Sequence, residues 1–371
     1  MKRGYCIAAA VSALAVVAGG CGSAAAPTTS STPAYQAQGP HTVGVTTLDL
    51  GSAGTLGERL ATVYYPTDPA SASGHPRFSY TEASTLPTAL QPILPAAYNT
   101  TTTIDAFTDA PGSGGPYPVV LFSHGFGGER LYYSNLLAGM ASWGYVVVSA
   151  DYLERGLAAQ SLGLKSTPTA AFDRSIMLRS LTVVEAASED AGVLHGTVDP
   201  SKVAAVGHSA GGGTAFNALD DPRVATAIGW APVAPAGAPS KKPVMLIGAE
   251  GDRAVLPRTV AHEFAAFPGP RSLVEISGEG HNTYTDICVG IREGGGLISY
   301  AVSHHFVSAS LAQLGINGCQ AKDLAPPRFW PIVQYYTVFQ LKAVFSRGPS
   351  TVPVPAANAF PGFTVQVTQP D

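Results

Sequence analysis

The sequence has little charge, few cysteines and no repeated unit. Only 12% of its 371 residues are Asp, Glu, Lys or Arg, and the formal net charge is -4. Without a basic stripe or a Lys/Arg cluster, no nucleic-acid partner is expected. The absence of a repeat excludes a propeller or solenoid. The glycines at Gly125, Gly127 and Gly128 lack the spacing of a dinucleotide fingerprint, so no cofactor is expected.

The N-terminus has the pattern of a secretory signal over residues 1–20. Lys2 and Arg3 precede an apolar run at 6–17, and small residues lead up to Cys21. The run is shorter than the roughly 20 apolar residues that a membrane-spanning helix needs. The small residues before Cys21 resemble the lipobox of bacterial lipoproteins, in which the cysteine carries the lipid. We therefore expect an extracytoplasmic protein anchored to the cell membrane through Cys21, or else an ordinary secreted one.

The rest of the chain divides by composition. Residues 21–40 are the lipidated cysteine and a flexible tether, because Ala, Ser, Thr and Pro without charge cannot build a core. Residues 41–347 form the predicted domain, and 348–371 form an irregular tail. Cys288 and Cys319 remain after processing, and in an oxidising compartment a disulfide between them is expected, with two free thiols as the alternative. We expect a monomer.

Short apolar runs alternate with helical patterns, which indicates an α/β fold. Near-continuous apolar runs are typical of strands buried on both faces, and strand, helix, strand order indicates a mostly parallel sheet with helices on both faces. An opening hairpin is predicted at 42–50 and 60–65. Further strands are predicted at 119–122, 145–150, 203–206, 225–230, 244–247 and 273–276, and helices at 134–143, 170–187, 212–219, 258–267 and 329–345. Residues 76–116 show no period, and we predict a long loop or lid there.

Ser209 is the candidate nucleophile. The apolar run 203–206 leads into Gly207-His208-Ser209-Ala210-Gly211, and a helical pattern follows. Strand, sharp turn and helix are the context of a nucleophile elbow, in which small residues let the backbone pass close by. The alternative is a structural turn.

A second glycine-rich segment, residues 123–128, follows the run 119–122. In the fold that carries an elbow, this loop supplies one N–H of the oxyanion hole and the residue after the nucleophile supplies the other. We therefore predict the backbone N–H groups of Phe126 and Ala210 as the two donors. His124, in the same segment, is predicted to be a structural histidine, because only one base is needed.

The base and the acid are expected in the order Ser, Asp or Glu, His. Residues 273–276 precede the Gly-rich loop that carries His281, which we predict to be the general base. Residues 244–247 precede Asp252, which we predict to be the orienting acid, with Glu250 and Asp286 as alternatives.

His304 and His305 could suggest a metal site near the C-terminal third. No third ligand follows at a recognisable spacing, so no metal is predicted.

The motifs at 118–128, 207–211 and 248–252 resemble those of the dienelactone-hydrolase-like esterases, which include bacterial cutinases and polyester hydrolases. The long loop before residue 119 and the segment 124–128 also resemble the plasma-type platelet-activating-factor acetylhydrolases. The resemblance implies the α/β-hydrolase fold. Two departures favour the cutinase-like arrangement. The acetylhydrolase branch carries its acid after the sixth strand, where this chain has Trp230, and true dienelactone hydrolases use cysteine where it has Ser209.

The expected reaction is two-step acyl transfer on a small-molecule, lipid-like, short-chain or polyester-type ester. We expect residues 76–116 and the disulfide-closed insert 282–328 to set the choice of substrate. The alternatives are a serine peptidase of the same fold and a non-catalytic lipoprotein that binds a ligand.

Overall fold

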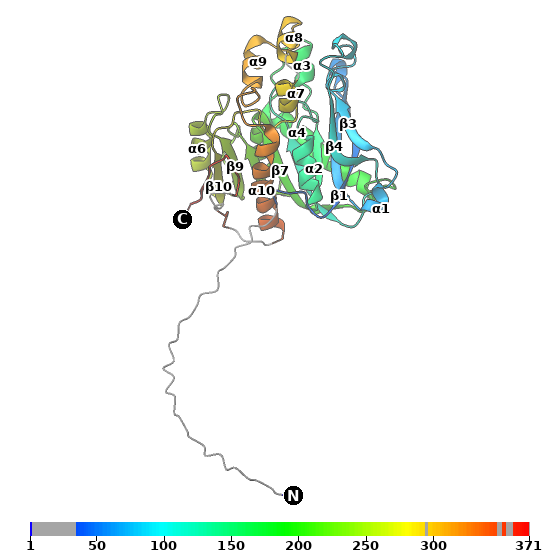
Figure 1. Cartoon of the computed structure of the whole chain (residues 1–371), viewed down its shortest axis with the longest axis vertical. Helices are drawn as coiled ribbons and strands as arrows, with labels where there is room; N and C mark the ends of the chain where they lie inside the picture. The colour runs from blue at the N-terminus through cyan, green and yellow to red at the C-terminus, as the bar shows by residue number, and fades with distance from the viewer. Residues whose placement is uncertain (2–34, 294–295, 347–350, 354–358, 371) are drawn as a thin grey trace. The chain divides into compact units, whose positions relative to one another are not determined.

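The computed structural model describes residues 1, 35–293, 296–346, 351–353 and 359–370 (Figure 1). The predicted signal peptide after Met1, Cys21 and most of the predicted tether lie outside the described residues. The chain divides into a unit of residues 1–33 and a compact unit of residues 34–371, and only the second is considered below. Among the helices in the described ranges, none has the length and apolar content needed to cross a bilayer.

An eleven-stranded sheet runs through the described part of the compact unit. Its order is β11-β10-β9-β8-β7-β5-β6-β2-β1-β4-β3. The strands are β1 (Thr42–Ser52), β2 (Glu58–Thr67), β3 (Arg77–Thr81), β4 (Thr101–Thr108), β5 (Tyr117–Ser123), β6 (Val146–Ala150), β7 (Val198–His208), β8 (Val224–Trp230), β9 (Val244–Ala249), β10 (Arg271–Ile276) and β11 (Val365–Thr368).

The central strands, β5 to β10, pair in parallel. Each of them contains an apolar run that the sequence predicts, and the opening hairpin of β1 and β2 is antiparallel, as expected. In β5, Val119 and Leu121 face one core while Val120 and Phe122 face the other. Burial on both faces therefore explains why these runs are apolar at every position.

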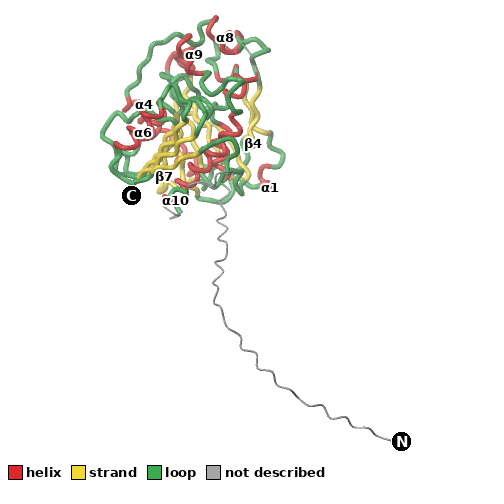
Figure 2. The backbone as a smooth tube through the Cα atoms, turned by 60° about the vertical axis from the view of Figure 1, so that its left-hand side comes forward, coloured by secondary structure: helices red, strands yellow, loops and turns green. Residues whose placement is uncertain are grey.

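Helices cover both faces of the sheet (Figures 1 and 2). The core on one face includes side chains of α2 and α10, and the core on the other includes side chains of α4, α5 and α6. The described helices are α1 (Pro69–Ala72), α2 (Ser134–Ser142), α3 (Leu157–Ser161), α4 (Ala170–Glu189), α5 (Ala210–Ala218), α6 (Pro257–Ala266), α7 (Ile287–Glu293), α8 (Leu297–Ser303), α9 (Ala309–Gly315) and α10 (Pro326–Phe345). The predicted α/β-hydrolase architecture is confirmed.

The structure corrects the prediction that residues 76–116 form a loop or lid without strands. That segment contains β3 and β4, which pair with each other and extend one edge of the sheet. β3 is the edge strand and β4 lies next to it; both have many exposed positions, and β4 is rich in threonine. Their sequences therefore lack the continuous apolar run of a central strand, which is why the sequence predicts no strand here.

The irregular tail predicted at 348–371 also contains a strand. β11 pairs antiparallel with β10 at the opposite edge of the sheet, over only four residues.

At the N-terminal end of the compact unit, residues 35–40 pack against α10 and Trp143, although their composition assigns them to the tether. The rings of Tyr35 and Trp143 meet edge to face at 4.9 Å, and the Gln334 amide donates to the carbonyls of Tyr35 and Ala37.

Candidate active site

Ser209 lies on a sharp turn between β7 and α5. Its φ of 55° and ψ of -119° are strained values for a residue with a side chain. A Cβ at Gly207 would collide with the backbone of Gly211, and one at Gly211 would collide with the carbonyl of Ser123. The two glycines are therefore required by close backbone contacts, as the elbow motif predicts.

The turn is at the point where the strand order reverses. β5 lies between β6 and β7, so the chain leaves β5 and β7 toward opposite sides of the sheet. In open α/β sheets, a crevice forms outside the carboxyl ends of the strands at such a switch point. This places the loop after β5 beside Ser209, and a Cβ at Gly125 would lie 3.2 Å from the Ser209 Cβ.

His281 and Asp252 are in direct contact. The His281 Nδ1–H donates to Asp252 Oδ2 over 2.7 Å, and both side chains are buried. The other carboxylate oxygen, Oδ1, accepts the backbone N–H groups of Ala254 and Val255, each at 2.8 Å. The carboxylate thus fixes the proton on Nδ1 and leaves Nε2 of the imidazole as an acceptor.

A second histidine, His208, holds the backbone of His281. Its Nε2–H donates to the His281 carbonyl over 2.9 Å, so its Nδ1 accepts the Tyr133 hydroxyl at 2.8 Å. Burial lowers the pKa of His208 well below its usual value, which keeps the ring neutral. Sequence reasoning missed this role, although His208 occupies the variable position before the serine in the elbow motif.

The two predicted oxyanion donors lie at the edge of the same site. Among the described residues, no acceptor receives the Phe126 N–H, whereas the next N–H, that of Gly127, donates to the Arg155 carbonyl over 2.8 Å. Ala210 is the first residue of α5, where N–H groups lack partners within the helix. Both N–H groups are therefore available to a bound oxygen.

The buried Arg155 guanidinium holds the loop after β5 in place. It donates to the His124 carbonyl and, at 2.7 Å, to the Ser123 hydroxyl, and it pairs with Asp173 at 2.6 Å. Sequence reasoning did not identify Arg155.

His124 has the structural role that the sequence analysis assigned to it. Its Nδ1–H donates to the Gly125 carbonyl over 2.8 Å, and its Nε2 accepts the Tyr152 N–H over 3.1 Å. Burial lowers its pKa well below the usual value. With both nitrogens bonded to backbone, the neutral ring braces the turn.

The alternative acids and the rival histidines lie elsewhere. Asp286 is buried and accepts the backbone and side-chain N–H groups of Asn135, and burial raises its pKa to about 7. Glu250 is exposed to solvent. His304 ends α8, where it stacks on Tyr300, and His305 follows it; both are exposed. Among the described residues, no group of three His, Cys, Asp or Glu side chains is arranged to hold a metal ion.

Ser209 and His281 line one pocket, with a volume of about 300 Å³. Phe126 and Asn282 also line it, but no residue of 76–116 does, contrary to the expectation that this segment helps set the choice of substrate. Most of the lining surface is apolar. Nine large aliphatic residues contribute to it, six of them from the insert 282–328: Leu157, Val233 and Val255, with Ile287, Ile291, Ile298, Val307, Leu311 and Leu314 from the insert. The insert thus supplies much of the apolar surface that lines the pocket beside Ser209.

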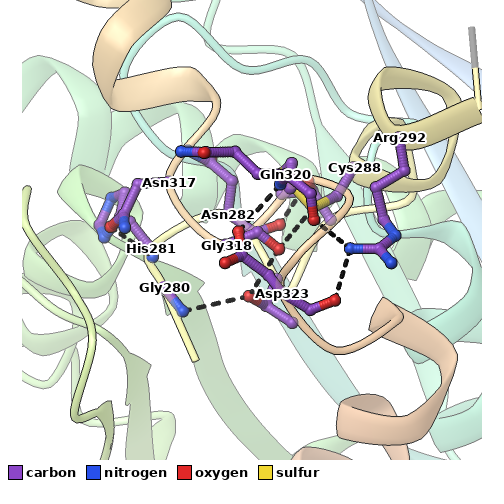
Figure 3. Close-up of a disulfide and its surroundings, with 12 residues drawn as sticks. Gly280, His281, Asn282, Cys288, Arg292, Asn317, Gly318, Gln320 and Asp323 are labelled. Atoms are coloured by element: carbon purple, nitrogen blue, oxygen red, sulfur yellow. Dashed lines mark hydrogen bonds between the residues drawn. A yellow bond between two sulfur atoms is a disulfide. The ribbon is translucent and has the colours of Figure 1, made fainter. Parts of the chain in front are cut away.

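The insert is closed by a disulfide. Cys288, in α7, is bonded to Cys319, with their Cα atoms 4.9 Å apart, as the cysteine count predicts (Figure 3). Between them lie α8 and α9, which Figure 1 shows together at one end of the compact unit.

Three comparisons relate this chain to known proteins. The family model for chlorophyllase matches residues 85–244, a stretch that includes Ser209 but ends before Asp252 and His281. The platelet-activating factor acetylhydrolase of Cavia porcellus is 24% identical, over 67% of this chain and 67% of that protein. The structure of a ferulic acid esterase from Streptomyces cinnamoneus superposes with a TM-score of 0.59 and 21% identity, covering 87% of this chain and 96% of that one.

The fold and these similarities define an α/β-hydrolase. Within that fold the chain is similar to esterases and to an acetylhydrolase, and these similarities support a carboxylic ester hydrolase. The expected resemblance to the acetylhydrolases is confirmed, with the departure noted above: β8 ends in the buried Trp230, which bonds to Thr337, and the carboxylate in contact with His281 follows β9 instead.

Proposed function

We propose that the protein hydrolyses esters through a Ser-His-Asp triad and an acyl-enzyme. His281 Nε2 takes the proton of Ser209, whose oxygen attacks the ester carbonyl, and the N–H groups of Phe126 and Ala210 stabilise the oxyanion. The protonated His281 then gives its proton to the leaving alcohol. Water enters, and the same histidine activates it to release the acid.

The bond between His281 and Asp252 is the observation that carries this proposal. It supports a ring with the proton on Nδ1 and a free acceptor at Nε2, which is the state that a general base requires. The base shares its pocket with Ser209, whose strained turn is typical of an exposed nucleophile.

The aliphatic pocket favours an apolar acyl chain. A site lined by leucine, isoleucine and valine gains affinity from each buried methylene, about 0.8 kcal/mol in transfer free energy. We propose that the acyl part of the ester lies against α7, α8 and α9, and that chains of moderate length are preferred because the volume is only about 300 Å³.

The alcohol part has a second place to bind. A neighbouring groove of about 310 Å³ shares Phe126 and Val233 with the pocket and is lined by Ala210, Asn217 and the exposed Thr167. Because the alcohol must leave before water can enter, we propose that it occupies this neighbouring groove, whose lining includes the side chains of Thr167 and Asn217. Phe126, which is 49% exposed, then separates the two parts of the substrate.

We further propose that the mature protein is a lipoprotein of the outer side of a cell membrane, anchored through Cys21. The disulfide between Cys288 and Cys319 supports an oxidising compartment. Growth with a radiolabelled or alkyne-tagged fatty acid should label the wild type, and Cys21→Ala should lose the label and leave the membrane fraction. A label that persists in the variant would disprove the anchor.

The function is tested with p-nitrophenyl esters of graded acyl length, run beside a peptide panel. We expect ester turnover that depends on chain length, loss of turnover and of fluorophosphonate labelling in Ser209→Ala, and no loss in Ser175→Ala, which changes an exposed serine of α4. Only the roughly 10³- to 10⁴-fold residual catalysis over water from binding and the oxyanion hole should survive in the Ser209 variant. Full labelling of that variant would refute the nucleophile, and turnover of peptides alone would favour the peptidase.

A further inference from the structure

One side chain connects the loop that carries the acid with the loop that carries the base. Asn317 Oδ1 accepts two backbone N–H groups, that of Arg253 and that of His281, each over 2.9 Å. Its Nδ2–H donates to the Gly251 carbonyl over 3.1 Å. The residues on both sides of Asp252 and the base itself are therefore bonded to one amide.

Asn317 makes these hydrogen bonds from near the end of the disulfide-closed part of the insert, which lines the pocket. Asn317 follows α9 and lies two residues before Cys319, whose partner is in α7. Figure 3 shows Asn317 beside His281, with Gly280 and Gly318 close together. A Cβ at Gly280 would collide with the Gly318 N–H, so the base loop and the insert are in backbone contact here. The Asn317 carbonyl also accepts the Asn282 N–H, over 2.9 Å.

The backbone of His281 is thus held from two sides. Asn317 takes its N–H and His208 donates to its carbonyl, while Asp252 takes the ring Nδ1–H. Apart from Asp252 itself, Asn317 is the one of these three partners that also hydrogen-bonds the backbone around the acid, at Gly251 and Arg253. An error of about 1 Å in the placement of a catalytic group can cost on the order of 10²-fold in rate.

We infer that Asn317 is a positioning residue that sets the spacing of the acid and base loops and couples the disulfide-closed insert to them. The inference rests on the proposed function, because it assigns Asn317 a role only through His281 and Asp252. Asn317 touches neither substrate nor reacting atoms. Its effect is to keep Nε2 of His281 in line with the hydroxyl of Ser209.

The experiment uses the full chain with its disulfide intact and compares three variants. Asn317→Ala removes all three side-chain bonds, so we expect kcat to fall by roughly 10- to 100-fold with KM changed by less than about threefold. The matched control is Arg292→Ala. Arg292 bonds the carbonyls of Gln320 and Asp323 within the same insert but contacts neither loop, so we expect a lower Tm with kcat within about twofold of the wild type.

Asn317→Asp keeps both acceptor bonds, loses the donor to Gly251 and adds a negative charge. Asp252 and the neutral His208 are the titratable side chains in contact with His281. A further negative charge favours the protonated imidazole, so the acid limb of kcat/KM should move to higher pH by about half to one unit. At pH values above that limb, kcat should be restored toward the wild-type value.

If Asn317→Ala lowers only the Tm, as Arg292→Ala does, and Asn317→Asp leaves the pH profile unchanged, Asn317 is a structural residue and the inference is wrong. That result differs from failure of the proposed function. In the latter case, the wild type itself would lack turnover that depends on Ser209.

Discussion

Replacing Asp252 by asparagine should disable the base while leaving the fold intact. The two carboxylate oxygens have different partners: Oδ2 receives His281 Nδ1–H, and Oδ1 receives the N–H groups of Ala254 and Val255. The introduced amide offers one oxygen and one NH₂ group. It can therefore satisfy either the histidine or the two backbone groups, but not both.

The backbone groups decide the orientation. Turning NH₂ toward Ala254 and Val255 would leave two buried donors unpaired, at about 1 to 3 kcal/mol each. Keeping the oxygen there costs less, because it only requires that the NH₂ group donate to Nδ1 of His281. The ring then carries its proton on Nε2, which is the wrong tautomer to receive a proton from Ser209. In the serine-protease example this change lowers kcat about 10⁴-fold, or roughly 5 kcal/mol.

The assay is steady-state hydrolysis of the best p-nitrophenyl ester. We expect Asp252→Asn to lower kcat by 10² to 10⁴-fold, on the order seen in the protease example, with little change in KM. The matched control is Asp286→Asn, which alters a buried carboxylate bonded to Asn135, and we expect less than about a tenfold change. If the control lost more activity than Asp252→Asn, the acid assignment and the tautomer argument would both be refuted.

Two further predictions concern stability. Replacing Cys288 and Cys319 by serine should lower the free energy of unfolding by about 4 kcal/mol, since the disulfide spans 31 residues, and chemical denaturation of the purified protein measures it. Burial, with the nearby charge of Asp286, raises the pKa of Glu82 from 4.5 to about 7. Because the folded state then holds this proton more tightly than the unfolded state, the Glu82 carboxyl should contribute a loss of about 3 kcal/mol to the pH dependence of stability as the pH rises from about 4.5 to 7. Glu82→Gln should remove this loss, and an unchanged pH dependence of the Tm in that variant would contradict the argument.

Much of the fold and the candidate site could be predicted from local sequence. Strands buried on both faces must be apolar at nearly every position, so β5 to β10 were recognisable one at a time. The elbow at Ser209 depends on residues within five positions of one another. Asp252 and His281 each follow such a strand, and the ends of parallel strands meet at one edge, so their proximity followed from strand order alone.

The strands at and next to the two edges of the sheet, and the supporting contacts, were decided only in three dimensions. β3, β4 and β11 bury one face or less, so no continuous apolar run marks them, and their assignment depends on the strand that each one joins. Asn317, His208 and Arg155 act on residues 31 to 73 positions away through backbone hydrogen bonds. A backbone N–H or carbonyl is present at every position, so the sequence carries no signal for which one a distant side chain will reach. The amino-acid sequence thus determined the central strands and the chemistry of the candidate triad, while tertiary packing decided the outer strands and what holds His281 and Asp252 in place.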